Sequence, residues 1–285
     1  MISQVKQEQP QMSIRHLCET LSVNRRWYYT RLAQGETADP DVELRDAIEQ
    51  IILEFAGYGY RRVTHALVRA GWSVNHKRVL RIMRAESLLC HLKRQFVPTT
   101  DSHHAFQVYP NLVKGLQVDA PDMLWVADIT YIRLLSSFVY LAALLDAYSR
   151  NCVGWHLSKR IATQVALAAL DKALATRDVR QGLIHHSDRG VQYASTAYVE
   201  RLLSVQAKIS MSAVGNPYDN AKAESFFKTL KQEEVYLKQY QIFEEAQANI
   251  GQFIEDVYNT KRLHSSLGYV PPEEFELAYA QDMRC

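Results

Sequence analysis

The hydrophobic pattern of this chain changes its period at a proline-containing stretch, residues 96–121. Before it, apolar residues recur at helical spacing, as in Leu44, Ile48, Ile51, Ile52 and Phe55. After it, β-branched and aromatic runs predict three strands, at residues 123–135, 138–148 and 152–157. This change of period predicts an all-α region followed by a domain of a different class.

Helical and strand patterns alternate in the second half. Residues 163–176, 195–205, 219–234 and 243–258 predict helices, and residues 183–186 and 207–212 predict short buried strands. Three strands followed by helix, strand, helix, strand and helix indicate a mixed α/β fold.

We therefore expect five parts. They are a small helix-turn-helix-like segment (1–38), a helical region with a helix-turn-helix pattern (43–95), an extended linker (96–121), a mixed α/β region (122–235), and a C-terminal segment with a further helix (236–285).

The composition excludes several classes of protein. With 285 residues, 47% of them hydrophobic, the chain can bury a sizeable core, so it is not a disordered protein. Its four cysteines form no Cys-x-x-Cys pair, which argues against a disulfide framework or a thiolate zinc site. No apolar run approaches the roughly 18 residues of a membrane span, and no signal peptide follows Met1. We expect a soluble cytoplasmic protein without a membrane partner.

A near-neutral total charge of +2 conceals a basic module. Between Gly57 and Thr100, nine basic residues face a single acid, Glu86, which makes a local balance of +8. The nine are Arg61, Arg62, Arg69, Lys77, Arg78, Arg81, Arg84, Lys93 and Arg94. Three short helices are expected here, with Ser73 capping a basic last one, as in a helix-turn-helix DNA reader. The alternative is a helical bundle with a solvated basic face. The high density of basic residues argues against it.

Three carboxylates are candidates for chemistry. Asp128 and Asp188 are expected at strand ends, and Asp128 lies in an apolar run where a buried acid is costly unless paired or bound to a cation. Glu224 lies on a predicted helix that presents Lys228 and Lys231 on the same face. Carboxylates from separate elements, without cysteine, suggest a magnesium site. For any one of them alone, a helix cap or a surface salt bridge is the simpler interpretation.

Three fragments carry a resemblance to a known family: Trp-Val-Ala-Asp-Ile-Thr-Tyr from Trp125, His-Ser-Asp-Arg-Gly-Val-Gln-Tyr from His186, and Gly-Asn-Pro-Tyr-Asp-Asn-Ala-Lys-Ala-Glu from Gly215. Together they resemble the catalytic core of DDE transposases and retroviral integrases, and the 35 residues between Asp188 and Glu224 match that family's spacing. The tail from Tyr258 to Phe275 and the helical region 43–90 resemble the transposase (OrfB) of the IS-three group of insertion sequences.

The resemblance implies a ribonuclease-H-like core with a mixed five-stranded sheet, in which Asp128, Asp188 and Glu224 hold two Mg²⁺ ions, for which Mn²⁺ can substitute. It also implies that Lys231 contacts the element's terminal DNA. The other DNA-contact candidates are Lys228 and the module's Arg61, Arg62, Lys77, Arg78, Arg81 and Arg84. The partners implied are double-stranded DNA (terminal inverted repeats and target), further copies of the chain, and an upstream-frame (OrfA) product or fusion, at the bacterial nucleoid.

Two departures from the group stand out. Leu263 occupies a place where the group commonly has proline, and we expect this to affect the shape of the loop. No zinc module precedes the core, because His103 and His104 are adjacent and have no spaced cysteines.

Several other polar or aromatic residues receive structural interpretations. We expect Asp146 to stabilise a turn, His185 and His186 to pack at a strand end, and Trp125 and Tyr131 to lie in the core. Asn259 and His264 are expected to hold the C-terminal loop.

The leading hypothesis is a DNA transposase that hydrolyses one strand at an element end and then joins the released 3′-hydroxyl to a second phosphodiester, without a covalent protein intermediate. Two alternatives remain open. One is a DNA-binding repressor with a degenerate core, and the other is a structure-selective nuclease that shares the fold.

Overall fold

A computed structural model describes residue 5 and residues 10–34, 41–90, 106–179, 182–212 and 220–283. Lys93, Arg94, His103, His104 and the predicted loop at Gly215 lie outside the described residues. The chain divides into two compact units, residues 1–49 and 50–285. No helix in the described ranges is both long and apolar enough to span a bilayer.

The described residues of the first unit include the short helices α2 (Ile14–Thr20) and α3 (Arg25–Gln34). The Ser13 side chain caps α2 by accepting a hydrogen bond from the amide of His16, and the Asn24 side chain accepts one from the amide of Arg26 before α3. Leu17, Cys18 and Tyr28 are buried in one small cluster. Both helices lie within residues 1–38, where the sequence analysis expected a small helix-turn-helix-like segment. A third helix, α4 (Val42–Glu54), crosses the boundary between the units.

The basic module continues with α5 (Tyr60–Arg69) and α6 (His76–Ala85). Val63 and Leu67 of α5 are buried, as are Val79, Ile82 and Met83 of α6. The prediction that Ser73 caps the last helix was wrong. The cap is Asn75, whose side chain accepts a hydrogen bond from the amide of Lys77, because the helix begins only at His76.

A mixed five-stranded sheet forms the centre of the second unit. Its strands are β1 (Leu124–Arg133), β2 (Phe138–Asp146), β3 (Cys152–Ser158), β4 (Ile184–Ser187) and β5 (Lys208–Met211). Their order across the sheet is β3-β2-β1-β4-β5. The first three strands pair antiparallel, whereas β4 pairs parallel with both β1 and β5. The predicted mixed sheet with helices is confirmed.

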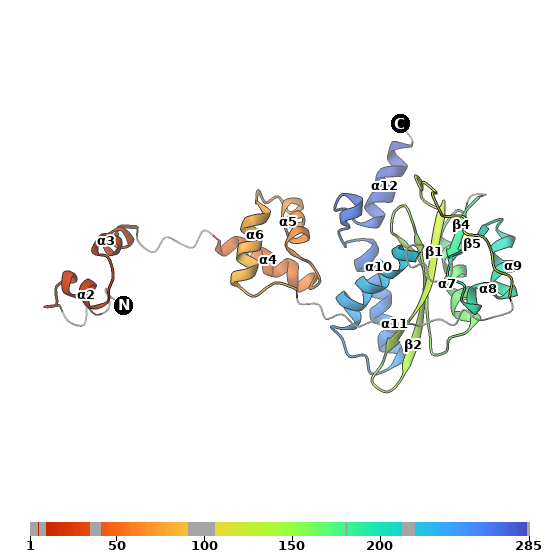
Figure 1. The fold of residues 1–285 in the computed structure, drawn as a ribbon, viewed down its shortest axis with the longest axis horizontal. Coiled ribbons are helices and arrows are strands. Elements are labelled where there is room, and N and C mark those ends of the chain that lie inside the picture. The colour runs from red at the N-terminus through yellow and green to blue at the C-terminus, as the bar shows by residue number, and fades with distance from the viewer. Residues whose placement is uncertain are drawn as a thin grey trace. The chain divides into compact units, whose positions relative to one another are not determined.

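Helices cover both faces of this sheet (Figure 1). On one face lie α7 (Thr163–Thr176), α8 (Val191–Ala194) and α9 (Thr196–Ser204). On the other lie α10 (Ala221–Leu230) and α11 (Phe243–Gln252). Alternate residues of β1 belong to the two cores: Trp125, Ala127 and Ile129 pack with α7, and Ile132 packs with α10.

Two predicted helices change their winding partway. Residues 219–234 were predicted as one helix, but α10 continues as a π-helix, η2 (Lys231–Val235). In the same way α11 continues as the π-helix η3 (Phe253–Asn259). Sequence periodicity does not distinguish these turns from an α-helix, because they add only one residue to each hydrogen-bonded ring.

The closing motif contains elements that the sequence analysis missed: the short 3-10 turn η4 (Ser265–Leu267) and the helix α12 (Pro272–Asp282). Pro272 suits the first turn of α12, where an amide proton has no helical partner. Asn259 holds the end of η3 to β3, because its side chain bonds both the amide and the carbonyl of Cys152.

The described part of the predicted linker, from residue 106, has no helix or strand, yet it contacts the sheet. Val113, Leu116 and Val118 pack against Leu124 and Val126 at the start of β1. The carbonyl of Pro110 accepts a hydrogen bond from the amide of Met211 at the end of β5. This segment therefore covers the edge of the core.

A stability test follows from the close approach of β3 to α7. A Cβ atom on Gly154 would lie 2.3 Å from the carbonyl oxygen of Ala169, which is backbone and cannot rotate away. We expect Gly154→Ala to lower the free energy of unfolding by about 1–3 kcal/mol, measured by urea denaturation. Gly59→Ala is the matched control, because an added methyl there meets nothing within 4 Å. Equal effects of the two changes would contradict this packing.

Candidate active site

Parallel pairing of β1 with β4 brings two of the predicted carboxylates to the same level of the sheet. Val126 pairs with His186, so Asp128 and Asp188, each two residues further along, lie at the same level. Neighbouring strands are about 4.8 Å apart. Asp188 follows the last residue of β4, as predicted, but Asp128 lies in the middle of β1. The expectation of a strand end was wrong for Asp128, because β1 continues beside β2 after its pairing with β4 has ended.

Asp188 lies in a tight turn between β4 and α8. Its Oδ1 accepts a hydrogen bond from the amide of Gly190 at 2.9 Å, and a Cβ atom on Gly190 would lie equally close to that oxygen. The neighbouring Arg189 donates from Nε to the carbonyl of Ser212, just after β5. The Ser-Asp-Arg-Gly sequence therefore shapes a turn that holds the Asp188 carboxylate at the end of the parallel pair.

Glu224 approaches from the helical layer. On α10 the residues Ala223, Phe226, Phe227 and Leu230 are buried against the sheet, whereas Glu224 is exposed. Side chains alternate along β1, so Asp128 shares a face with Ile132, the face that α10 covers. The third carboxylate thus belongs to the helix on the same side of the sheet as Asp128.

The electrostatics of Asp128 link the three carboxylates. Burial, and then the negative charge of Asp188, raise the pKa of Asp128 to about 8. Glu224 raises this pKa further, while a hydrogen bond from the amide of Ile129 at 2.8 Å and the positive charge of Lys231 oppose the rise. A carboxyl so placed holds a proton at neutral pH until a cation compensates the neighbouring charges.

Lys231 stands beside this group. Its Nζ lies 4.6 Å from the centre of the Tyr131 ring, a cation–π contact. Burial lowers the pKa of Lys231, and the Asp128 carboxylate works against that effect. The sequence analysis expected Tyr131 in the core, and it is half-buried beneath the lysine. Lys228, one turn after Glu224, is exposed.

The sequence analysis missed Tyr193. Its hydroxyl is buried and has no hydrogen-bond partner within the described structure. Burial raises the pKa of Tyr193, and the charges of Tyr198, Asp128 and Asp188 raise it further. The only signal in the sequence was its position five residues after Asp188, in the fragment that carries the family resemblance.

The chemistry of these residues fits divalent cations. Asp188 and Glu224 both raise the pKa of Asp128, and Lys231 opposes them, so added positive charge would relieve the repulsion at Asp128. Within the described ranges, no three aspartate, glutamate, histidine or cysteine side chains converge closely enough to hold one ion. Magnesium usually keeps several of its waters, so each ion of a pair needs only one or two carboxylate ligands.

The residues given structural interpretations behave as expected. Asp146 accepts hydrogen bonds from the amides of Asp122, Tyr148 and Ser149, which confirms a turn-stabilising role. His185 and His186 are fully buried and bond the hydroxyls of Tyr198 and Ser210. Trp125 is buried in the core.

The basic module presents most of its predicted DNA-contact residues to solvent. Arg61 on α5 and Lys77, Arg78, Arg81 and Arg84 on α6 are exposed. Arg62 is different: it is half-buried, with its guanidinium 5.7 Å from the centre of the Tyr58 ring.

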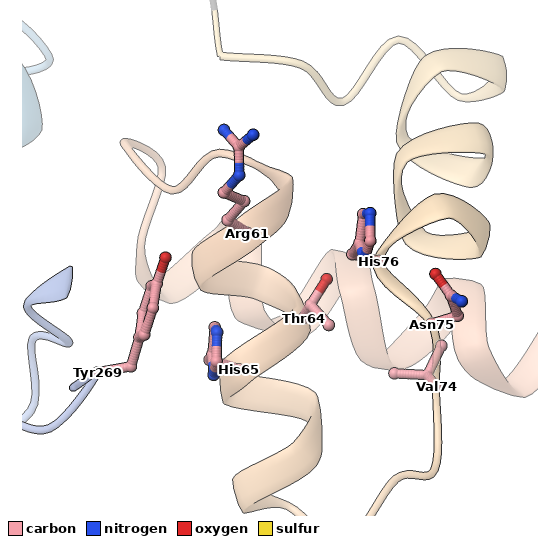
Figure 2. A pocket seen from close by; sticks show the side chains of 7 residues that line it. All are labelled: Arg61, Thr64, His65, Val74, Asn75, His76 and Tyr269. Carbon is pink, nitrogen blue, oxygen red and sulfur yellow. The ribbon is translucent and has the colours of Figure 1, made fainter.

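An open cavity of about 470 Å³ lies beside the N-terminus of α6. Figure 2 shows Arg61, Thr64 and His65 of α5 on one side, and Val74, Asn75 and His76 on the other. Tyr269 of the closing motif completes the lining, with its ring beside His65. An open cavity at the start of a basic helix, lined in part by Arg61, Asn75 and His76, suits a phosphate group.

Comparisons with known families also separate the basic helical module from the region that holds the carboxylates. The profile of the integrase core domain family matches residues 118–217, and a second integrase core domain profile matches residues 205–272. The profile of an HTH-like domain family matches residues 39–96.

Similar proteins span nearly the same length. The transposase for insertion sequence element IS904 of Lactococcus lactis is 37% identical over 235 residues, which cover 82% of this chain and 93% of that protein. Transposase InsF for insertion sequence IS3A of Escherichia coli K12 is 34% identical over 278 residues, which cover 95% of this chain and 96% of that protein. Among solved structures, the HTLV-2 integrase catalytic core domain in complex with magnesium is 16% identical, with a TM-score of 0.43, and the match covers 55% of this chain and 97% of that one.

The raised pKa of Asp128 has a consequence for stability. The folded protein keeps this proton up to about pH 8, whereas the unfolded chain loses it near its ordinary value of 3.8. The free energy of unfolding of the metal-free protein should therefore fall as the pH rises through this window. Asp128→Asn removes the titrating group and with it this fall in the free energy of unfolding. We therefore expect the variant to melt a few degrees above the wild type at pH 8 and close to it at pH 4.

Thermal melting in the presence of a chelator measures this difference. Glu200→Gln, which changes an exposed carboxylate on α9, serves as the control. The same melting difference for Asp128→Asn at both pH values would show that its charge is not the cause.

Proposed function

Because this chain belongs to the insertion-sequence transposases of the IS3 group, we propose that it cuts DNA at the ends of an insertion element and joins those ends to target DNA. The observation that carries the proposal is the alignment of Asp128 with Asp188 across β1 and β4, on the face that α10 and Glu224 cover. The exposed basic helix α6 supplies the affinity for DNA.

In this proposal Asp128, Asp188 and Glu224 hold two divalent ions, with magnesium favoured by the all-oxygen ligand set and manganese as a substitute. When bound, such ions activate an attacking oxygen and neutralise charge on the leaving oxygen of a phosphodiester. The hydrogen bonds from Ile129 and Gly190 orient the carboxylates of Asp128 and Asp188. Asp128 must give up its proton for this role, so cation binding is coupled to pH.

Lys231 completes the site. Its half-buried side chain contacts the Tyr131 ring and interacts electrostatically with Asp128, and we place its ammonium against a phosphate oxygen of the terminal DNA. Lys228, exposed one helical turn from Glu224, can contact a neighbouring phosphate. In this proposal the enzyme's contribution is to position the DNA and to neutralise charge.

The DNA-binding module supplies recognition of the ends. Lys77, Arg78, Arg81 and Arg84 contact phosphates and bases at the terminal inverted repeats, with α6 in the major groove. Two ends must meet for joining, so the active form contains several copies of the chain on DNA, with an upstream-frame (OrfA) product as a further partner or fusion. This work takes place in the bacterial cytoplasm, at the nucleoid.

The first experiment tests the carboxylates. The assay uses the purified full chain, labelled element-end DNA and Mg²⁺. We expect Asp188→Asn to reduce cleavage and strand transfer by at least about 100-fold. Loss of a residue that only hydrogen-bonds a metal ligand already lowers activity by about 10–100-fold, and Asp188 is proposed as a ligand itself. Binding of the end DNA should persist. Glu200→Gln is the matched control, because it neutralises an exposed carboxylate on the far face of the sheet.

Three outcomes of this experiment count against the proposal. Wild-type strand transfer by Asp188→Asn would remove the assigned chemistry. DNA protection without cleavage by the wild type would favour a repressor with a degenerate core. Cleavage of branched DNA whatever its end sequence would favour a structure-selective nuclease.

The second experiment tests the DNA-binding helix. Arg81→Ala and Arg84→Ala each remove one exposed cation of α6, so each should weaken binding to end DNA and reduce the slope of log affinity against log salt by about 1. Fluorescence anisotropy over a series of salt concentrations measures this slope. Arg15→Ala, at an exposed arginine of α2, is the comparison, and an equal change there would argue against a specific role for α6.

A further inference from the structure

The turn that precedes α5 contacts the catalytic half of the chain through a buried tyrosine. Tyr58 is 1% exposed, and its hydroxyl accepts a hydrogen bond from the amide of Leu263 at 2.7 Å. The Phe55 ring stacks on the Tyr58 ring, with 4.6 Å between centroids and 12° between planes. Leu263 was expected to affect only the shape of its loop. Its amide is used here, and a proline at this position has no amide proton to donate.

A buried ion pair lies beneath this turn. Arg262 bonds Glu233 through two hydrogen bonds of 2.6 and 2.7 Å, and the two side chains are only 3% and 9% exposed. Such a pair holds its geometry well, because separating the partners leaves a buried charge uncompensated. Gly57 packs directly on it: a Cβ atom at this position would lie 2.3 Å from Cγ of Glu233. Only a residue without a side chain fits there.

Further contacts surround the turn. The His65 ring of α5 stacks on the ring of Tyr269, with 3.6 Å between centroids (Figure 2), and Arg69 makes two hydrogen bonds to Glu274 of α12. Tyr269 has a φ of +63°, in the left-handed region that costs a bulky residue about 1–2 kcal/mol. The fold accepts this strained backbone at the residue whose ring meets α5.

The same contacts lead to the active site along one helix. Glu233, against which Gly57 packs, and Lys231, whose charge acts on Asp128, belong to the same π-helix, η2. This π-helix continues α10, which carries Glu224. π-Helical turns are frequent at functional sites. On the other side, the turn leads directly into α5, which packs with α6.

We propose that the Gly57–Tyr58 turn, seated on the Glu233–Arg262 pair, is a positioning joint that decides which phosphodiester of the bound element end reaches the carboxylates. The joint rests on the proposed transposase function and adds to it. DNA recognised by α6 is held at a set distance from Asp128, Asp188 and Glu224, because the joint connects the reading helices to η2. Gly57, Tyr58, Glu233 and Arg262 are positioning residues that do not touch the reacting atoms.

Gly57→Ala is the primary test, with Gly59→Ala as its matched control in the same turn. The added methyl at Gly57 must displace Glu233 from Arg262, whereas a methyl at Gly59 meets nothing within 4 Å. With the full chain and end-labelled element DNA, we expect Gly57→Ala to keep its affinity for the end within about twofold, although its melting temperature falls because the buried Glu233–Arg262 pair is disturbed. Cleavage should fall about tenfold to a hundredfold and spread to neighbouring phosphodiesters, because small displacements of a reacting group have effects of this size. Gly59→Ala should cut as the wild type does.

Tyr58→Phe is a second, milder variant. It keeps the ring and removes only the acceptor for the amide of Leu263, so we expect faster hydrogen exchange at Leu263 together with a smaller spread of cleavage positions. Hydrogen exchange tests the joint without DNA. Unchanged exchange at Leu263, together with wild-type cleavage positions and rates in both variants, would overturn the joint.

A footprint separates this proposal from the proposed function. If the wild type binds element ends but does not cut them, the assigned chemistry fails. The joint is then judged by the length of DNA that the full chain protects. A shorter or divided footprint for Gly57→Ala than for Gly59→Ala supports the joint, and identical footprints refute it.

Discussion

Parallel pairing between β1 and β4 is the interaction on which the active site depends. It lasts for only three residues of each strand, from Leu124 to Val126 and from Ile184 to His186, and ends two residues before both aspartates. Hydrogen bonds between neighbouring strands fix the relative position of the residues that follow them. Asp128 and Asp188 therefore meet although 60 positions separate them in the chain. A shift of this register by one residue would turn one carboxylate to the opposite face.

This arrangement has an unfavourable electrostatic energy. Asp128 is placed among like charges in a half-buried position, which raises its pKa to about 8. Folding alone does not relieve this repulsion, since Lys231 is shared with the Tyr131 ring. Sites that bind cations often keep such unfavourable charge, because the ligand compensates it on binding. The same repulsion that destabilises the metal-free protein thus favours cation binding.

The closing motif joins the parts of the second unit. Its Leu263 contacts Tyr58, and its Tyr269 and Glu274 contact the helix α5. Its Arg262 binds Glu233, on which Gly57 packs. It also closes on itself through a bridge between His264 and Val270. A DNA-binding helix and a carboxylate site need a defined separation to act on one DNA end. Buried, bidentate and stacked contacts suit that purpose better than exposed ion pairs, which contribute little.

The sequence alone predicted most of the secondary structure and the candidate carboxylates. The three long strands and α7 were predicted nearly residue for residue, because alternation and helical spacing are local properties. The three carboxylates were singled out by residue type, context and family spacing, and their roles remain a prediction. The cap at Asn75, the π-helices and α12 were missed, since each depends on backbone hydrogen bonds that periodicity does not reveal. Only the tertiary structure decided that Tyr193 lies under the influence of the aspartates and that Gly57 rests on Glu233. These contacts join distant parts of the chain, and they exist because strand pairing and burial bring those parts together.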